Sequence, residues 1–257
     1  MKVLLTRNEL QNASMQLSLE KLGIETVNVA LIGQESISSS QEFSSLLSAI
    51  EQISQKKQFV DDVIFISPSS AEFGAEEFLN YLATVSDKSC RTFAVGKGTA
   101  MLLKAQFPVF GDILFPTEGA GSQALLNMPE MQNLDQRNML IITGAEGKPF
   151  LEEQLLKRKA QVFRWECYKR VKPTGLSVQL MQVLELGIDS VFFHSAHAAR
   201  HFVESIASVD NTQMLQAVVG SHAIQDELHR LGWRGQILQA DSPMPKDMLD
   251  CFIQSFS

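Results

Sequence analysis

Two stretches of this chain repeat one pattern about 125 residues apart, and this repeat constrains the fold more than any other feature. Residues 63–71 (VIFISPSSA) and 191–199 (VFFHSAHAA) both run from an apolar, β-rich segment through a serine into small residues typical of a helix start. Residues 92–103 (TFAVGKGTAMLL) and 217–228 (AVVGSHAIQDEL) form a second such pair. A repeat of this length predicts two copies of one α/β domain.

Apolar runs of strand length alternate with segments of helical periodicity along the whole chain. The clearest segments are strands at 2–7, 25–32, 60–67 and 161–171, and helices at 9–22, 38–54 and 122–131. This order is typical of an α/β protein with parallel sheets that carry helices on both faces. Ligands of such sheets bind outside the carboxyl ends of the strands, so two facing copies predict a cleft between the domains.

The two copies are expected to be interleaved in the sequence. Residues 38–168 hold a complete set of strands and helices, whereas the later copy lacks counterparts of its first strands. The spare N-terminal strands complete that copy, which predicts a discontinuous domain of residues 1–33 and 173–257 with residues 38–168 inserted in it. The Ser-rich segment 36–45 is expected to be a linker and a helix cap. The alternative, two consecutive domains divided near residue 130, leaves the halves unbalanced.

Charge and cysteine content exclude several classes of protein. A net charge of −7 disfavours nucleic acid as the main partner, because phosphate contacts need a basic surface. Cys90, Cys167 and Cys251 form no CxxC pair, which indicates a reducing cytoplasm and neither disulfides nor a zinc knuckle. Residues 2–7 predict a first strand and not a signal peptide, and no apolar run is long enough to cross a bilayer.

Two glycine-containing loops follow predicted strands and open predicted helices. Gly96, Lys97 and Thr99 lie in the first loop, where main-chain N–H groups and the helix dipole favour an anion. The spacing of this loop matches neither a P-loop nor a dinucleotide-binding fingerprint, and a structural turn explains it equally well. The second loop runs from Gly144 to Lys148, and its alternative interpretation is an ordinary solvated turn.

Three histidines, His194, His197 and His201, have a spacing that superficially suggests a metal site. Only the last two would share a helical face, and no carboxylate is placed to complete the site. We therefore expect no metal there and interpret these residues as solvated side chains at the rim of a cleft. Nucleophilic catalysis by Ser195 with His197 has no GxSxG elbow to support it.

Tyr168 ends a long predicted strand between the two expected domains, with Lys169 and Arg170 beside it. A phenol in this position suits a proton donor in a site with few other charged groups. The bland interpretation is a strand tyrosine whose ring is packed and whose hydroxyl lies in water. Periodicity alone favours the bland interpretation.

An ordered set of short motifs resembles the uroporphyrinogen-III synthase family. From the N-terminus the motifs are VLLTR, VIFISPSSA, AVGKGTA, LLNMPEMQN, MLIITGAEGK, VFRWECYKR, FFHSA and VVGS. Each motif is loose, but together they cover nearly the whole chain, and the likeness to the proteobacterial form is greatest around residues 112–170. The resemblance implies two flavodoxin-like parallel-sheet domains, the second inserted in the first, joined by a two-stranded linker.

The resemblance also implies a reaction in tetrapyrrole (haem) biosynthesis. The linear tetrapyrrole hydroxymethylbilane would be cyclised to uroporphyrinogen III, with loss of water, inversion of ring D, and neither a metal nor an organic cofactor. By motif match, Tyr168 would be the catalytic tyrosine that assists departure of the terminal hydroxyl, and Thr99 the family's cleft threonine. Ser67 and Ser195 would be small hydroxyl residues at two facing strand ends.

A substrate of this class carries eight carboxylates, so an acidic protein needs local anion sites. The predicted substrate-binding residues are strand-end hydroxyls, loop glycines and nearby cations: Arg7, Ser67, Gly96, Lys97, Gly144, Lys148, Ser195 and Ser221. The family often has arginine where this chain has Thr143, which leaves Lys148 as the nearest cation to the second loop. We expect a cytoplasmic monomer that makes transient contact with the preceding enzyme of the pathway and has no membrane or nucleic-acid partner.

Two other interpretations stay open at this point. A non-catalytic cytoplasmic two-domain protein that binds a small ligand would have the same fold, because fold alone does not decide function. A nucleotide-dependent enzyme using residues 96–100 is disfavoured by the spacing of its glycines.

Overall fold

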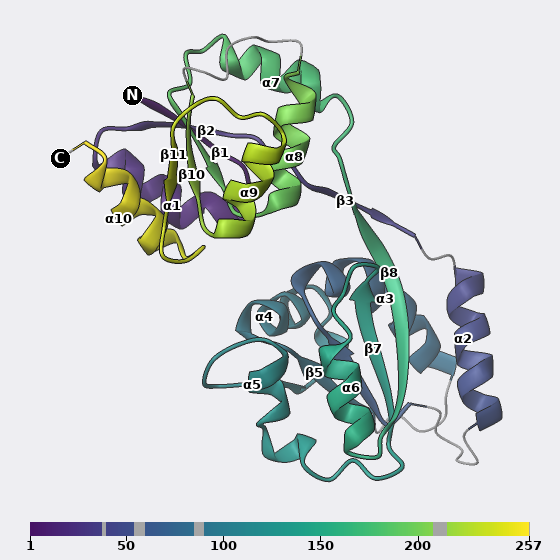
Figure 1. Cartoon of the computed structure of the whole chain (residues 1–257). Helices are drawn as coiled ribbons and strands as arrows, with labels where there is room; N and C mark the ends of the chain where they lie inside the picture. The colour runs from purple at the N-terminus through teal and green to yellow at the C-terminus, as the bar shows by residue number, and fades with distance from the viewer. Residues whose placement is uncertain (38–39, 54–59, 85–89, 208–214, 257) are drawn as a thin grey trace. The chain divides into compact units, whose positions relative to one another are not determined.

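The computed structural model describes residues 1–37, 40–53, 60–84, 90–207 and 215–256. These residues form two compact units. The terminal unit comprises Met1–Gly33 and Val171–Ser257, and the central unit comprises Gln34–Arg170. In each unit helices pack against a sheet (Figure 1), as expected for an α/β protein with parallel sheets.

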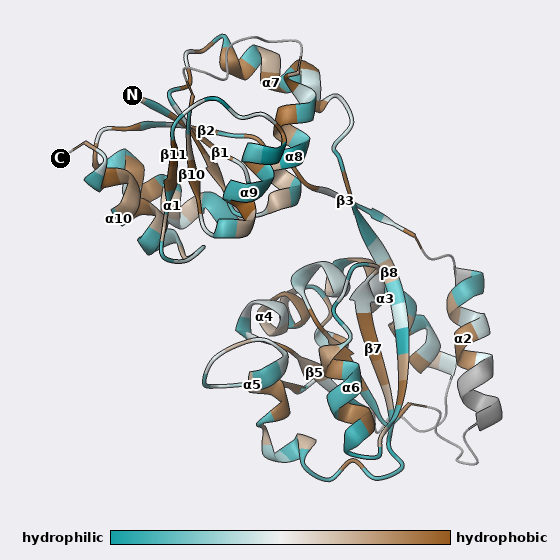
Figure 2. Cartoon of the chain, viewed as in Figure 1, coloured by the Kyte–Doolittle hydropathy of each residue, from teal (hydrophilic) through white to brown (hydrophobic). Residues whose placement is uncertain are grey.

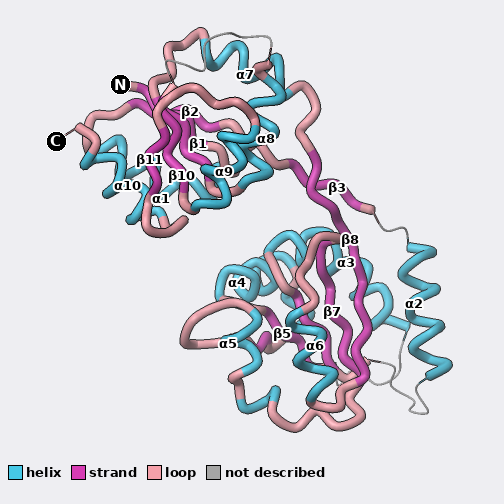
Figure 3. The backbone as a smooth tube through the Cα atoms, viewed as in Figure 1, coloured by secondary structure: helices cyan, strands magenta, loops and turns pink. Residues whose placement is uncertain are grey.

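The terminal unit is built on a five-stranded parallel sheet in the order β11-β10-β9-β1-β2. Its strands are β1 (Lys2–Leu5), β2 (Glu25–Asn28), β9 (Ser190–Phe193), β10 (Gln216–Val219) and β11 (Ile237–Gln239). Its helices are α1 (Glu9–Lys21), α7 (Leu176–Leu184), α8 (Ala196–Ser205), α9 (His222–Arg230) and α10 (Pro245–Gln254). Strand β1 lies between β2 and β9, so the N-terminal residues complete a sheet that the C-terminal residues begin (Figure 3).

Two apolar layers enclose this sheet. One layer contains buried residues of α7, α8 and α9, among them Phe202, together with Phe193 of β9. The other contains buried residues of α1 and α10, among them Met15 and Phe252, together with Phe192 of β9. Consecutive phenylalanines of β9 thus point to opposite layers, as the two-residue repeat of a strand requires.

The central unit has a six-stranded sheet in the order β3-β8-β7-β4-β5-β6. Its strands are β3 (Gly33–Ser36), β4 (Asp62–Phe65), β5 (Arg91–Ala94), β6 (Ile113–Leu114), β7 (Asn138–Gly144) and β8 (Gln161–Val171). Its helices are α2 (Ser40–Ile53), α3 (Pro68–Thr84), α4 (Lys97–Gln106), α5 (Ser122–Leu126) and α6 (Phe150–Lys157). Short 3-10 turns at Pro108–Phe110 and Pro129–Met131 follow α4 and α5.

Strand β7 is the most apolar part of the central sheet. All seven of its residues are buried, and its ribbon is almost uniformly brown in Figure 2. Its alternate residues enter two different apolar clusters, Leu140 and Ile142 on the α3 side and Met139 and Ile141 on the side of α5 and α6. A strand covered on both faces reads as a continuous apolar run, which is why MLII was recognisable as a strand.

Three local expectations differ from the structure. Strand β2 ends at Asn28 and does not continue to residue 32. The helix expected at 122–131 stops at Leu126, and Pro129 opens a separate 3-10 turn, because proline lacks the N–H that a continuing helix needs. The expected linker 36–45 begins inside strand β3 and ends inside α2, and its residues 38 and 39 lie outside the described residues.

A buried carboxylate ties three strands together at the amino end of the central sheet. Asp62 is fully buried, and each of its oxygens accepts hydrogen bonds from Arg91 and from Arg137 at 2.6 to 3.1 Å. The bond to Asp62 raises the pKa of Arg137, as expected for a guanidinium paired with a carboxylate. This charge cluster lies at the opposite end of β4 from Ser67, so we assign it a structural role.

The variant Asp62→Asn is expected to lose about 3 kcal/mol of unfolding free energy, because it leaves two arginines facing a neutral buried group. Urea unfolding followed by circular dichroism measures this loss. The exposed Asp112→Asn serves as the control and is expected to change stability by less than about 0.5 kcal/mol. Equal midpoints for the Asp62 variant and the natural chain would contradict a stabilising role for the cluster.

Candidate active site

Four neighbouring strands of the central sheet carry predicted functional residues near their carboxyl ends. The order β8-β7-β4-β5 places Gly144, Ser67 and Gly96 at or just beyond adjacent carboxyl ends, and Tyr168 lies beside Gly144, three residues before the end of β8. Parallel strands present these ends at one edge of the sheet. The fold therefore gathers, at this carboxyl edge, residues that are up to 101 positions apart in the sequence, as Ser67 and Tyr168 are.

The hydroxyl groups of Tyr168 and Ser67 form a hydrogen bond of 3.1 Å. Ser67 is held in place by the first turn of α3, where its Oγ accepts from the Ser70 amide at 3.0 Å and its carbonyl accepts from Ser70 Oγ at 2.7 Å. Tyr168 is only 6% exposed. The bland interpretation of Tyr168 is thus correct for the ring, which is packed, and wrong for the hydroxyl, which bonds to Ser67 and not to water alone.

A β-bulge aims Tyr168 at Ser67. Along the β7–β8 ladder Thr143 pairs with Glu166, but the next residue, Gly144, pairs with Tyr168, so Cys167 is an extra residue on β8. Both Cys167 and Tyr168 consequently join the apolar cluster on the α3 side. Uninterrupted alternation would have placed Tyr168 on the opposite face with Glu166. Without the bulge the phenol would point away from Ser67.

The Cys167 side chain fills the space beneath the bulge. Its Sγ lies 3.5 Å from the Thr143 carbonyl and 4.0 Å from the Ser70 carbonyl. Burial raises the pKa of the Cys167 thiol to about 12, so this group stays protonated and is no nucleophile.

Gly144 is the surface on which the Tyr168 ring rests. A Cβ atom on Gly144 would lie 2.7 Å from Cζ of Tyr168, closer than real contacts allow. On another side the ring stacks with Phe73, with centroids 5.6 Å apart. Gly144 is therefore required by the close approach of the phenol, a role that the prediction of an anion-binding turn did not include.

The loop of Gly96, Lys97 and Thr99 starts helix α4 just after β5. Lys97 and Gly98 are exposed at the start of this ten-residue helix, where the helix dipole favours a negative charge. Thr99 is 3% exposed and belongs to the buried side of the helix. Its predicted catalytic role therefore requires a hydroxyl that is largely covered in this structure.

Arg164 is the functional candidate that sequence reasoning missed. Lys148 was expected to be the cation nearest the turn 144–147, but it is the guanidinium of Arg164 that contacts this turn, at the carbonyls of Gly144 (3.2 Å) and Gly147 (3.1 Å). Lys148 itself is exposed. Arg164 lies in the middle of β8, twenty residues from Gly144, and only the strand pairing could have linked the two.

The terminal unit also places predicted residues at the carboxyl ends of its strands. Arg7 follows β1, Ser195 follows β9, and Ser221 follows β10, in adjacent positions of the sheet. Ser195 caps α8 by accepting from the Ala198 amide at 3.2 Å, and Ser221 precedes α9 in extended conformation without a side-chain cap bond. Arg7 donates to Gln11 at 3.1 Å, and burial lowers its pKa.

The three histidines differ in their surroundings. His201 Nδ1 lies 2.7 Å from the Leu31 carbonyl, and His197 is exposed. Within the described ranges no group of three His, Cys, Asp or Glu residues is arranged to hold a metal ion. His194 is half-buried with an unpaired Nδ1, and burial, followed by the positive charge of Arg7, lowers its pKa to about 4. The prediction of a solvated side chain at the rim of a cleft is therefore wrong for His194.

This shift predicts that the protein loses stability in mild acid. The unfolded chain binds a proton at His194 near pH 6.5, whereas the folded chain does so only near pH 4, so the contribution is full above pH 6.5 and lost as the pH falls toward 4. The natural chain is expected to lose up to about 3 kcal/mol of unfolding free energy between pH 6.5 and pH 4 through this group, and His194→Gln is expected to abolish that loss. Urea unfolding at several pH values measures it, and parallel curves for the two proteins would contradict it.

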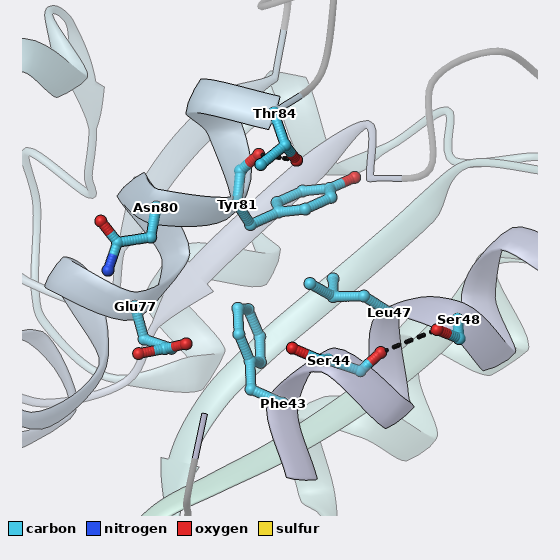
Figure 4. A pocket seen from close by; sticks show the side chains of 8 residues that line it. All are labelled: Phe43, Ser44, Leu47, Ser48, Glu77, Asn80, Tyr81 and Thr84. Carbon is cyan, nitrogen blue, oxygen red and sulfur yellow. Dashed lines mark hydrogen bonds between the residues drawn. The ribbon is translucent and has the colours of Figure 1, made fainter. Parts of the chain in front are cut away.

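A separate hollow of about 310 Å³ lies between α2 and α3 of the central unit (Figure 4). Its apolar wall includes Phe43, which stacks on Trp165 at 4.0 Å, and Tyr81, while serines and Glu77 line other parts. It contains none of the predicted site residues. We therefore do not place the candidate active site there.

A parallel α/β sheet whose hydroxyl, glycine and cationic residues gather at neighbouring carboxyl ends defines a class, the open α/β proteins that bind ligands at this edge. Within that class, a family model described as "Uroporphyrinogen-III synthase HemD" matches residues 13–250. The chain belongs to the uroporphyrinogen-III synthase family.

Individual relatives agree with this assignment. The chain is 42% identical over 81 residues to uroporphyrinogen-III synthase of Salmonella typhimurium and 38% identical over 79 residues to that of Escherichia coli. These two matches span 31% and 30% of this chain and about a third of each relative, 32% and 31%. The synthase of Proteus mirabilis is 25% identical over 171 residues, which is 66% of this chain and 81% of the relative.

A solved structure supports the fold. Uroporphyrinogen-III synthetase from Helicobacter pylori aligns with a TM-score of 0.56 at 14% identity, over all of both chains. No helix among the described residues is long and apolar enough to cross a membrane.

Proposed function

We propose that this protein is a uroporphyrinogen-III synthase, which cyclises hydroxymethylbilane to uroporphyrinogen III with loss of water and inversion of ring D. The observation that carries the proposal is the Tyr168–Ser67 hydroxyl pair at the carboxyl edge of the central sheet, in a chain of this family. A hydroxyl pair without a strong acid suits a reaction whose first step is the departure of a hydroxyl from an electron-rich pyrrole.

In the first step the C–O bond of the terminal hydroxymethyl group breaks. The bonding electrons leave with the oxygen, and the pyrrole nitrogen of the substrate stabilises the resulting azafulvene cation. Ser67, the less buried of the pair, donates its proton to the departing oxygen while Tyr168 donates its own to Ser67. The leaving group is then water, and Tyr168 is left as a phenolate in a short-lived pair with the cation.

In the later steps ring D attacks the azafulvene carbon through its substituted α-carbon, which forms a spiro intermediate. The bond from this carbon to the methylene bridge of ring C then breaks and leaves a second azafulvene cation. Its methylene carbon bonds to the unsubstituted α-carbon of ring D, which inverts the ring and gives the type III isomer, and the proton that this α-carbon loses returns to Tyr168. The overall change is loss of one water molecule. The protein's main contribution is to hold the flexible chain in the reactive conformation, because the substrate supplies its own electronic stabilisation. The reaction so written draws on no cofactor.

Cations and helix starts near the strand ends can bind carboxylates even though the protein as a whole is acidic. We propose that substrate carboxylates bind the first turns of α3 and α4 with Lys97, and the turn at Gly144 with Lys148. Arg7, Ser195 and Ser221 are proposed to bind further carboxylates at the strand ends of the terminal unit. The net charge of −7 is compatible with this arrangement, because binding depends on the few groups within a Debye length of each carboxylate.

We also propose that the protein works as a cytoplasmic monomer and receives its substrate by transient contact with the preceding enzyme of the pathway. Sedimentation at micromolar concentration is expected to give a mass near the 28.6 kDa of one chain.

Isomer analysis tests the proposed function. Purified protein mixed with hydroxymethylbilane is expected to give the type III isomer, whereas the uncatalysed reaction gives type I. The products, oxidised to porphyrins, are separated by chromatography. If only type I forms at high protein concentration, the protein is no synthase, and the alternative of a ligand-binding protein gains support.

A further inference from the structure

We propose that Arg164 is a positioning residue, which holds Tyr168 in its working orientation through the turn 144–147. This inference rests on the proposed synthase function and adds to it a residue that touches neither the substrate nor the reacting atoms.

Arg164 binds the turn at two points. Its Nη2 donates to the carbonyls of Gly144 at 3.2 Å and Gly147 at 3.1 Å, while Nε donates to Glu166 at 2.9 Å and so fixes the plane of the guanidinium. The side chain is 20% exposed. A Cβ on Gly147 would lie 2.9 Å from Nη2, which shows how closely the turn fits around the arginine.

One peptide group of this turn is held at both ends by residues of β8. The Gly144 carbonyl of that group accepts from Arg164 at 3.2 Å and from the Gly147 N–H within the turn at 3.0 Å, and the Ala145 N–H of the same group donates to the Tyr168 carbonyl at 2.9 Å. Because a peptide unit is planar, a tilt at one end moves the other. Arg164 therefore constrains the main chain of Tyr168 from four positions earlier on the same strand.

The ring of Tyr168 depends on the same peptide group. It lies over Gly144 closely enough that even one methyl group would not fit between them. Rotation of the Gly144–Ala145 peptide would shift this support and move the hydroxyl relative to Ser67. The bulge at Cys167 interrupts the ladder beside this point, so fewer strand hydrogen bonds resist such a rotation.

A second arginine of the central unit provides a matched control. Arg158 Nη1 also donates to two main-chain carbonyls, those of Leu126 (2.8 Å) and Met131 (2.6 Å). These carbonyls belong to the α5 region and the following 3-10 turn, and Leu126 and Met131 lie in a different apolar cluster from Tyr168. Loss of Arg158 thus imitates the structural cost of losing a carbonyl-binding arginine without disturbing the phenol.

The test is a double-mutant cycle on turnover. Arg164→Met is expected to lower kcat about tenfold with little change in KM. In the Tyr168→Phe background the same substitution is expected to lower kcat by less than about twofold, because Arg164 acts through the Tyr168 hydroxyl. Arg164→Lys keeps the positive charge but has fewer hydrogen-bond donors, so its kcat is expected to lie between those of the natural chain and Arg164→Met. This variant also provides the test if Arg164→Met does not fold. Arg158→Met is expected to lower the melting temperature and to keep kcat within about twofold.

The outcomes separate this inference from the proposed function. Equal losses from Arg164→Met in both backgrounds, or an equal loss from Arg158→Met, would overturn the positioning role while the natural chain still makes type III product. Absence of type III product from the natural chain would instead overturn the synthase function.

Discussion

Replacement of Tyr168 by phenylalanine is expected to lower the rate of type III formation about a hundredfold. A positioned proton donor contributes on the order of 10²–10⁴-fold to a reaction, and the remaining Ser67 hydroxyl and the fold of the site retain part of the catalysis. The melting temperature is expected to fall only slightly, because one neutral hydrogen bond is lost, which is worth about 1 kcal/mol. Single-turnover assays with chromatographic separation of the isomers measure the rate.

Tyr81 provides the control for this substitution. The chain has only two tyrosines, and Tyr81 lies on α3 beside the hollow and not at the carboxyl edge. Tyr81→Phe is expected to retain the natural turnover within about twofold, as substitutions away from a site usually do. If the two variants turn over equally fast, Tyr168 has no part in the chemistry.

Gly144→Ala is expected to have the second largest effect. The added methyl group would lie 2.7 Å from Cζ of Tyr168, so the ring must move, and its bond to Ser67 must lengthen or break. We expect a loss of turnover of at least tenfold and a loss of about 1 to 3 kcal/mol in unfolding free energy, as for other overpacked sites.

A second cycle shows whether the Tyr168 ring is the cause. In the Tyr168→Ala background the methyl group has room, so Gly144→Ala is expected to cost less than about 0.5 kcal/mol of stability there. Urea unfolding of the four proteins measures the coupling. An undiminished cost in that background would mean that the alanine strains the main chain and does not collide with the ring.

The fold was predictable from the sequence where burial alone decides the structure. Strand β7 is buried on both faces and β9 alternates between two apolar layers, so hydrophobic patterns identify both. Elements that depend on local chemistry or on pairing at a sheet edge were harder to predict from the sequence. Pro129 ends a helix that its apolar pattern would have continued, and the polar strand β3 exists only through its place beside β8.

The candidate site was predictable as a set of residues but not as an arrangement. Strand-end positions identified Ser67, Gly144 and Tyr168, since parallel sheets bring such ends together. The alternation of WECYK indicates the wrong face for Tyr168, because a bulge leaves no mark on hydrophobic periodicity. Arg164 was missed for a related reason, because its partners are main-chain carbonyls of a distant turn.

A titration of tyrosine-labelled protein followed by NMR tests most directly whether the substrate reacts, and its porphyrinogen product binds, at the carboxyl edge of the central sheet. The two tyrosine signals are assigned with the two phenylalanine variants, and uroporphyrinogen III is added under reducing conditions. We expect the Tyr168 signal to shift on binding while that of Tyr81 stays in place. A shift of Tyr81 alone, or binding that moves neither signal, would contradict it.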